Sequence, residues 1–183
     1  EYLNHINESA RQLLARISKM LRYADATAGR IRYEAEPSDS RDLVQELLHQ
    51  LRASAQNASV NINCDDIEPA TINIDVSHTI YALSNIIENS IRASTSGATV
   101  SIAGRLTQEG GYALTISDTG CGMTEQQLKA AFQPFSIAEE VRTRTLEGVG
   151  LGLTLAEKIL TDQSALMQIE STVGVGTTVR IAF

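Results

Sequence analysis

The sequence has few aromatic residues and no excess of basic charge. Aromatic side chains make up 4% of the 183 residues, and tryptophan is absent. Asp and Glu number 22 against 15 Lys and Arg, which gives a formal net charge of −7. Nucleic acid phosphates select basic surfaces and unpaired bases stack on aromatic rings, so both deficits argue against a nucleic acid partner.

Cysteine and long apolar runs are also scarce. Cys64 and Cys121 lie far apart, and neither has a CxxC or Cys/His neighbour. We therefore expect neither a disulfide framework nor a structural zinc site, and we expect a reducing compartment. No apolar run approaches the roughly 20 residues that cross a bilayer, and no signal peptide follows Glu1. The chain is expected to be a cytoplasmic fragment of a protein that could be membrane-anchored when complete.

The first 28 residues carry a heptad pattern. Apolar residues recur at alternating steps of three and four, at Leu3, Ile6, Ala10, Leu13, Ile17, Met20 and Ala24. We call these residues the seam, because such spacing is typical of a coiled coil or helix bundle. The alternative is an ordinary amphipathic helix packed on its own domain. The pattern holds for about four heptads, longer than the usual globular helix of about three turns, and Gly29 is placed to end it.

The rest of the chain alternates between helical and strand patterns. Helices are expected from Ser40 or Arg41, over 77–93, over 124–131 with Thr124 and Gln127 as a capping box, and over 151–161. Strands are expected over 59–64, 71–75, 99–105, 112–118, 167–171 and 177–183, and 33–40 reads as a short strand or linker. Residues 136–150 lack periodicity and are expected to form a mobile loop. Helices on one side of a largely antiparallel sheet predict an α+β fold, a two-layer α/β sandwich.

The helix over 77–93 carries an unusual polar stripe. At about 100° per residue, Asn85, Glu88, Asn89 and Arg92 fall on one face, with Ile80, Leu83, Ile87 and Ile91 opposite. The alternative is a solvated face, but such faces favour Lys and Glu over paired Asn, a mediocre helix former. An amide oxygen is a suitable ligand for Mg²⁺, and an Arg can meet phosphate oxygens.

Two glycine-rich stretches follow. In "DTGCGM", Asp118 ends a strand pattern and precedes Gly120 and Gly122. Asp118 could accept a hydrogen bond from the exocyclic amino group of adenine, while the bare backbone lies against a flat base. In "EGVGLGL", glycines precede a helix, which is a typical anion site. Each stretch alone can be a simple turn.

Taken in order, these elements are more specific. The amide-rich helix, DxGxG, FxPF (132–135), GxGLG and a final GxGT (174–177) resemble the sequence boxes of two-component histidine kinases. Residues 31–183 resemble the catalytic ATP-binding domain of the GHKL superfamily, which has the Bergerat fold. Residues 1–30 resemble the second helix of the dimerisation and histidine-phosphotransfer hairpin.

The resemblance implies ATP and Mg²⁺ as ligands. Asn89 would coordinate Mg²⁺, with Asn85 and Arg92 on the phosphate side, and Glu88, the only acid on the stripe, is the candidate base. Asp118 would bind the adenine amino group, and Gly120, Gly122 and Thr177 would complete that end. The residues that would line the triphosphate are Gly148, Gly150, Leu151 and Gly152. Residues 136–147 would form the lid, with Arg142 or Arg144 on the γ-phosphate. Phe132 and Phe135 would anchor the base of the lid, which is compatible with the alternative that both are simply core residues.

The resemblance also implies partners outside the chain. The phosphoacceptor His motif is missing, and His5, His49 and His78 are expected to be solvated or structural. The partners would be a helix carrying that His and a response regulator protein, with a homodimer in the complete protein. One departure is Arg92 where the family usually has Lys, followed by Ala93 in place of an aromatic residue. Arg keeps the charge of Lys but not its geometry at a phosphate.

Three other functions remain open. A hydrolytic GHKL ATPase would carry Glu at the position of Asn85, and an amide cannot act as a general base. A non-catalytic nucleotide-binding module acting through protein contacts is opposed by the intact DxGxG and GxGLG. A serine-kinase anti-sigma factor is the third alternative, but that class of protein does not account for the N-terminal heptad helix.

Overall fold

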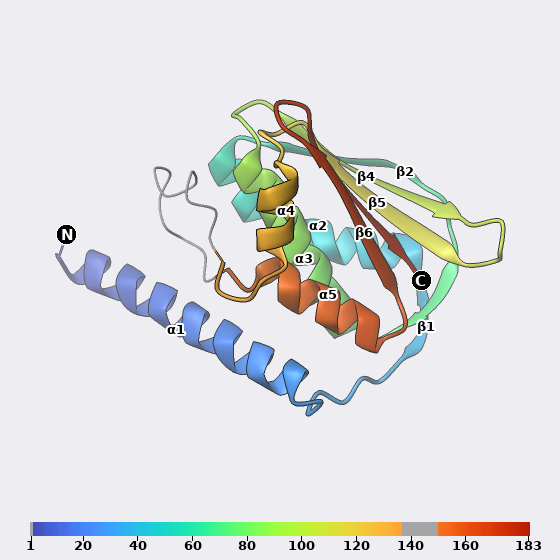
Figure 1. The fold of residues 1–183 in the computed structure, drawn as a ribbon, viewed down its shortest axis with the longest axis horizontal. Coiled ribbons are helices and arrows are strands. Elements are labelled where there is room, and N and C mark those ends of the chain that lie inside the picture. The colour runs from blue at the N-terminus through green and yellow to red at the C-terminus, as the bar shows by residue number, and fades with distance from the viewer. Residues whose placement is uncertain (1, 137–149) are drawn as a thin grey trace.

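The fold is a sheet covered on one face by helices, with a long helix set outside them (Figure 1). The structure is a computed structural model and describes residues 2–136 and 150–183. The elements in chain order are α1 (Tyr2–Thr27), β1 (Glu36–Asp39), α2 (Ser40–Ala58), β2 (Asn61–Ile67), β3 (Thr71–Ile74), α3 (Val76–Ala93), β4 (Thr99–Leu106), β5 (Tyr112–Asp118), α4 (Glu125–Ala131), α5 (Gly152–Asp162), β6 (Leu166–Thr172) and β7 (Gly176–Ala182). The predicted α+β two-layer architecture is confirmed.

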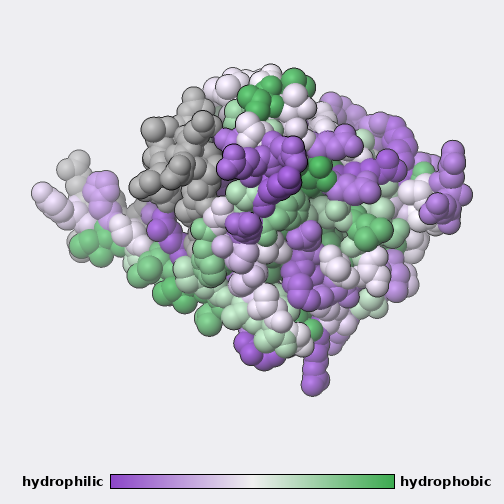
Figure 2. Space-filling view, viewed as in Figure 1, coloured by the Kyte–Doolittle hydropathy of each residue, from purple (hydrophilic) through white to green (hydrophobic). Residues whose placement is uncertain are grey.

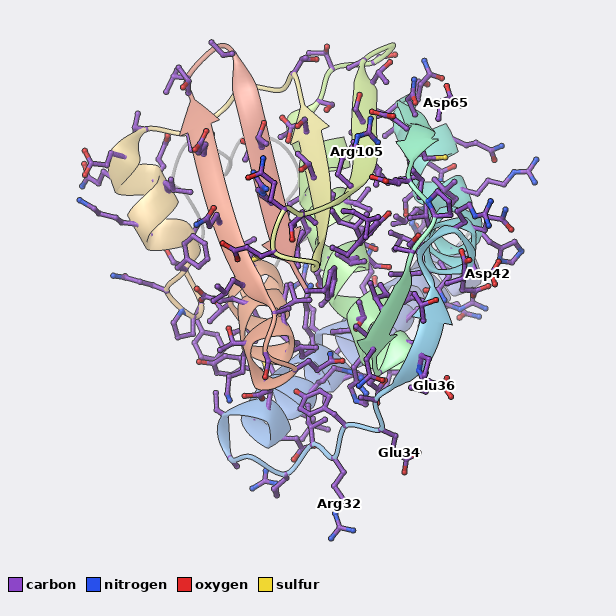
Figure 3. The ribbon with its side chains drawn as sticks, turned by 90° about the vertical axis from the view of Figure 1, so that its right-hand side faces the viewer. Arg32, Glu34, Glu36, Asp42, Asp65 and Arg105 are labelled. Carbon is purple, nitrogen blue, oxygen red and sulfur yellow. The ribbon has the colours of Figure 1, made fainter. Side chains whose placement is uncertain are left out.

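The main sheet has five strands in the order β2-β4-β5-β7-β6. β2 runs parallel to β4, and the other three pairs are antiparallel. β1 and β3 form a separate two-stranded antiparallel ribbon. The edge strand β2 is protected by charge and by a break in register between Asn63 and Asp66, two devices that discourage pairing with another chain. Figure 3 shows Asp65 projecting outward there, as do Glu34, Glu36 and Asp42 further along this side of the molecule.

The core lies between the sheet and the layer formed by α2, α3 and α5. Ile102, Leu114 and Ile116 of the central strands are at most 2% exposed, and they meet Leu83 and Ile87 of α3, which are fully buried. The apolar face predicted for α3 is thus confirmed. The capping box at Thr124 and Gln127 is also present at the start of α4.

α1 ends where the sequence predicts, and most of it stands clear of the core. Gly29 has a φ of 64°, and Arg30 N–H bonds back to Asp25 O, a left-handed helix end that glycine adopts without strain. The exposed large apolar residues of α1 are Tyr2, Ile6, Leu13, Leu14, Ile17, Met20 and Leu21. Figure 2 shows a hydrophobic strip along the lower left, where α1 runs. Within residues 2–136 and 150–183, no helix is long and apolar enough to cross a bilayer.

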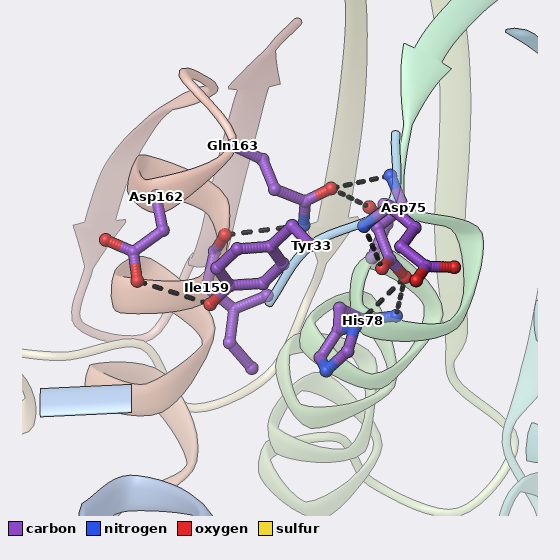
Figure 4. A network of polar contacts seen from close by, with 8 residues as sticks. Tyr33, Asp75, His78, Ile159, Asp162 and Gln163 are labelled. Carbon is purple, nitrogen blue, oxygen red and sulfur yellow. Dashed lines mark hydrogen bonds and ion pairs between the residues drawn. The ribbon is translucent and has the colours of Figure 1, made fainter. Parts of the chain in front are cut away.

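A polar network ties the segment after α1 to the helical layer (Figure 4). Asp75 caps α3 by accepting from His78 N–H at 2.9 Å, and its other oxygen accepts from Glu34 N–H at 2.9 Å. Gln163, which follows α5, accepts from Asp75 N–H at 2.8 Å. Tyr33 donates to Asp162 at 3.2 Å and its ring meets His78 edge-on. Burial raises the pKa of the Asp75 carboxyl, but the backbone N–H groups of Glu34 and His78, with the imidazole 3.0 Å away, outweigh this and lower that pKa.

Candidate nucleotide-binding site

Asp118 is held in a fixed orientation at the end of β5. Its side chain is 7% exposed, and its Oδ1 accepts from Gly120 N–H at 2.9 Å and from Thr177 N–H at 3.2 Å. Thr177 lies directly opposite Asp118 in the pairing of β5 with β7. Within the described ranges, Oδ2 has no hydrogen-bond partner. One oxygen is therefore fixed by the backbone while the other stays available as an acceptor.

The two glycines after Asp118 are required by the protein itself. A Cβ on Gly120 would lie 2.5 Å from Ala93 O, at the end of α3. A Cβ on Gly122 would lie 2.0 Å from Thr172 O, and its φ is 63°. The turn is thus pressed between α3 and the β6–β7 hairpin, and no side chain fits there. Contact of these glycines with a flat base stays a prediction.

A chain of hydroxyl contacts supports the same end of the site. Thr177 Oγ1 lies 2.8 Å from Ser171 Oγ, which also accepts from Met123 N–H at 2.9 Å and bonds to Gly176 O. These contacts join β6, β7 and the turn after β5. Ser171 and Met123 were not anticipated from the sequence, because only the strand pairing brings them together.

The polar stripe of α3 begins deeper than expected. Asn85 is only 5% exposed and its amide donates to Tyr81 O at 2.8 Å. Glu88 and Asn89 are half-buried, and Arg92 is exposed. The Arg92 guanidinium donates to Asn89 Oδ1 and lies 3.9 Å from Glu88. The Asn89 oxygen predicted to hold Mg²⁺ is therefore engaged by Arg92 here.

The first turn of α5 faces this stripe. A Cβ on Gly152 would lie 3.4 Å from Asn85 Oδ1 and 3.8 Å from Asn89 Nδ2. The preceding Leu151 is fully buried, and no described side chain caps the helix. The start of α5, with its free N–H groups and the positive end of its helix dipole, thus lies beside the amides of α3, and a helix start of this kind can bind an anion.

The same place is reached by a residue that the sequence analysis missed. Lys19 of α1 puts its Nζ 3.3 Å from that Cβ position on Gly152. Burial lowers the pKa of Lys19, Glu88 opposes this and Arg92 adds to it. Residue spacing in the sequence could have indicated Lys19. A second face of α1, distinct from the seam, is formed at steps of three and four by Lys19, Arg22, Tyr23 and Ala26.

The predicted lid lies largely outside the described residues. Arg142, Arg144 and Gly148 fall in 137–149, so their predicted roles stay predictions. Both flanks of this segment meet, because Phe135 N–H bonds to Gly150 O at 3.0 Å. Gly150 has a φ of 67°, and a Cβ there would lie 2.5 Å from Ser136 O. The two ends are therefore joined beside the start of α5.

The two phenylalanines of FxPF differ. Phe132 is half-buried and packs against the core, whereas Phe135 is 58% exposed and meets the Tyr23 ring edge-on at 6.2 Å. The alternative that both are simply core is wrong for Phe135, which contacts α1 instead. His5 and His49 are exposed, and His78 lies 3.0 Å from Asp75, in agreement with solvated or structural roles.

The oxygen atoms of the site suit a metal ion that is bound partly by the protein and partly by the phosphates of a nucleotide. Among the described residues no group of three His, Cys, Asp or Glu side chains could hold a metal ion. On the polar stripe of α3, the side-chain oxygens of Asn85, Glu88 and Asn89 are hard donors that suit Mg²⁺. Such a set fits Mg²⁺ that arrives with phosphate oxygens, because Mg²⁺ is commonly bound by one or two protein groups plus substrate phosphates.

The chain resembles solved histidine kinases along nearly its whole length. It superposes on the Acinetobacter baumannii histidine kinase AdeS with a TM-score of 0.77 at 16% identity, over 99% of this chain and 82% of that one. For full-length ShkA in complex with AMPPNP the TM-score is 0.84 at 20% identity, over 99% of this chain and 37% of that one. At such identities the likeness establishes the fold.

Sequence comparison identifies the family. Residues 74–183 match the family described as histidine kinase-, DNA gyrase B-, and HSP90-like ATPase. The sensor histidine kinase GacS of Pseudomonas protegens is 30% identical over 183 residues, which is 96% of this chain and 20% of that protein. Because the match covers more than half of the sequence, the chain belongs to this ATPase family. It spans 18–24% of the length of the curated relatives that it matches.

Proposed function

We propose that this chain binds Mg-ATP and is the catalytic part of a two-component sensor histidine kinase, which transfers the γ-phosphoryl group to a His outside the chain. The observation that carries the proposal is the continuity of α3. Its Asn85 and Asn89 face Gly152, and its last residue, Ala93, touches Gly120 beside Asp118. One helix therefore links an acceptor suited to adenine with a helix N-terminus suited to phosphates.

The residues of this chain would act by positioning. Asp118 Oδ2 would accept from the adenine amino group, while the N–H groups of α5 and the cations near α3 hold the phosphates. Mg²⁺ held by Asn89 and the phosphates would neutralise charge during transfer. Arg92 would then release Asn89 Oδ1 and turn to a phosphate oxygen. Arg142 or Arg144 of the proposed lid would meet the γ-phosphate.

Hydrolysis is the weaker alternative. The buried Asn85 amide donates to Tyr81 O and cannot remove a proton from water. Glu88 is the acid on the stripe, but it is half-buried beside Arg92 and its neighbour Asn89 is the proposed metal ligand. A non-catalytic nucleotide-binding module is favoured by no contact in the site.

The decisive experiment supplies the missing nucleophile. A fragment carrying the phosphoacceptor His helix is mixed with this chain and radiolabelled ATP. We expect label that is lost in acid, because phosphohistidine is acid-labile, and negligible labelling of the chain alone. Asn89→Ala should eliminate transfer, whereas the matched Asn73→Ala on the β1–β3 ribbon should not. Acid-labile label on His5, His49 or His78 of the isolated chain would contradict the proposal.

The N-terminal helix has its own proposed role. We take residues 1–30 as the second helix of a dimerisation and phosphotransfer hairpin, and 31–183 as the ATP-binding domain. The exposed seam supports this, since Ile6 and Leu13 are 64% and 59% exposed and a stripe of that length is an association surface. Its partners would be the His-bearing helix and a second subunit, with a response regulator receiving the phosphoryl group.

The seam can be tested by charge. Replacing Leu13 and Ile17 by Glu should abolish self-association of a dimeric form that includes the preceding helix. Sedimentation velocity would measure this, with Arg11→Glu as the control on the same helix. An unchanged dimer after the double replacement would refute the role of the seam.

A further inference from the structure

We propose that Lys19 is a phosphate-binding residue that α1 contributes to the ATP site, so that nucleotide binding fastens α1 to the catalytic domain. The inference rests on the proposed function and adds to it a residue from outside the family match, which begins at residue 74. Its ligand is the β- or γ-phosphate of a bound nucleotide.

The position of the ammonium group carries the inference. Lys19 Nζ lies 3.3 Å from a Cβ position on Gly152, next to Asn85 Oδ1 and Asn89 Nδ2 at 3.4 and 3.8 Å from the same point. A long, flexible lysine on an otherwise exposed helix would normally extend into water. Here its Nζ ends beside Gly152, in the first turn of α5. Two independent cationic features, a lysine and a helix N-terminus, thus converge on one place.

The backbone of α1 is held so that Lys19 reaches this place. Arg22 stacks over the ring of Tyr81 at 4.2 Å, Tyr23 meets Phe135, and Ala26 is 1% exposed. These three residues and Lys19 lie on one helical face at steps of three and four, and they contact α3 and the flank of the predicted lid. Lys19 therefore belongs to the face of α1 that packs against the rest of the chain and is not an isolated surface residue.

The charge balance indicates an anion. Glu88 lies 3.9 Å from Arg92 and also attracts the ammonium group of Lys19, so one negative charge faces two positive charges. These three side chains near Gly152 therefore carry a net positive charge. The triphosphate of Mg-ATP would balance it, with the lysine as a point charge of the kind common in phosphate sites.

The test compares three variants by calorimetry and NMR titration. Lys19→Gln keeps a polar side chain and removes its charge, Lys19→Arg keeps the charge, and Arg11→Gln removes a charge from α1 away from the site. The probes are Mg-AMPPNP and adenosine, which lacks phosphate. Lys19→Gln should weaken Mg-AMPPNP about tenfold or more, as expected for a lost charge-assisted hydrogen bond. Its adenosine affinity should be unchanged, while Lys19→Arg and Arg11→Gln should retain most of the Mg-AMPPNP affinity.

A second measurement tests whether nucleotide binding holds α1 against the catalytic domain. Amide hydrogen exchange over residues 19–27 should slow when Mg-AMPPNP binds to the parent chain, and this effect should be lost in Lys19→Gln. Equal Mg-AMPPNP binding by Lys19→Gln overturns the inference. Tighter binding also overturns it, because Lys19 would then compete with Mg²⁺ for the site. Loss of adenosine affinity in Lys19→Gln also overturns it, since the role would then be structural. If the parent chain binds neither probe, the proposed function itself fails.

Discussion

The two ends of the site differ in how completely the protein specifies them. At the Asp118 end, one carboxylate oxygen is fixed by two backbone N–H groups and the adjacent turn cannot accept a Cβ at Gly120 or Gly122. At the Gly152 end, the groups are side chains that bond to one another, and the lysine comes from a different helix. Backbone groups thus define the proposed base site, whereas the proposed phosphate site would have to release Asn89 Oδ1 from Arg92 to receive its ligand.

The largest effect is expected from Asp118→Asn. The amide oxygen can still accept from Gly120 and Thr177, so its NH₂ group would face the adenine amino group, donor against donor. Affinity for AMPPNP should fall about tenfold to hundredfold, measured by calorimetry. Cys121→Ala in the same turn is the control, because that side chain is exposed and only its backbone makes hydrogen bonds. Equal affinity of Asp118→Asn and the parent would remove the difference between the two ends.

A pair of glycine replacements should separate stability from binding. Gly120→Ala should lower the free energy of unfolding by about 1–3 kcal/mol, because the new Cβ meets the Ala93 carbonyl. Gly152→Ala should leave stability intact, since the nearest atom is the flexible end of Lys19 and Ala favours helix. Its effect should instead be weaker Mg-AMPPNP binding. Urea unfolding and calorimetry measure the two quantities, and equal destabilisation by both replacements would contradict the comparison.

The smallest effect is expected from Thr177→Val. The change keeps the shape and the backbone N–H bond to Asp118, and it removes only the hydroxyl contact with Ser171. AMPPNP affinity should fall about threefold, as for one neutral hydrogen bond. The control is Thr178→Val, one residue along β7, whose hydroxyl contacts Ser117. A loss as large as that of Asp118→Asn would mean that the hydroxyl chain, and not the carboxylate, defines the base site.

The sequence predicts well whatever depends on neighbours along the chain. The bounds of α1, β5 and α4 follow from periodicity and capping, and the apolar face of α3 follows from its 3.6-residue repeat. The order of the polar helix, DxGxG and GxGLG identifies the family without any three-dimensional information. These signals are local, so they survive without knowledge of the packing.

The features that were missed depend on packing between distant segments. The four-residue strands β1 and β3 carry too little pattern to predict their pairing, and the parallel placement of β2 beside β4 depends on the crossover through α3. In the sequence, Lys19 occupies an ordinary polar position of a heptad. Its neighbour in space, Gly152, lies 133 residues further along the chain, so no local pattern connects the two. The sequence does not predict that the Phe135 ring meets Tyr23 of α1, because the two residues are far apart along the chain.

The network at Asp75 gives α1 a pivot. Tyr33 and Glu34 are tied to the ends of α3 and α5, so a tilt of α1 turns about its C-terminal end. At 1.5 Å per residue, Lys19 lies about 12 Å and Tyr2 about 38 Å from Thr27 along the helix. If α1 rotates about its C-terminal end, a displacement of 1 Å at Lys19 corresponds to about 3 Å at Tyr2. The proposed phosphate contact at Lys19 would thus displace the far tip of the helix about three times as far as Lys19 itself.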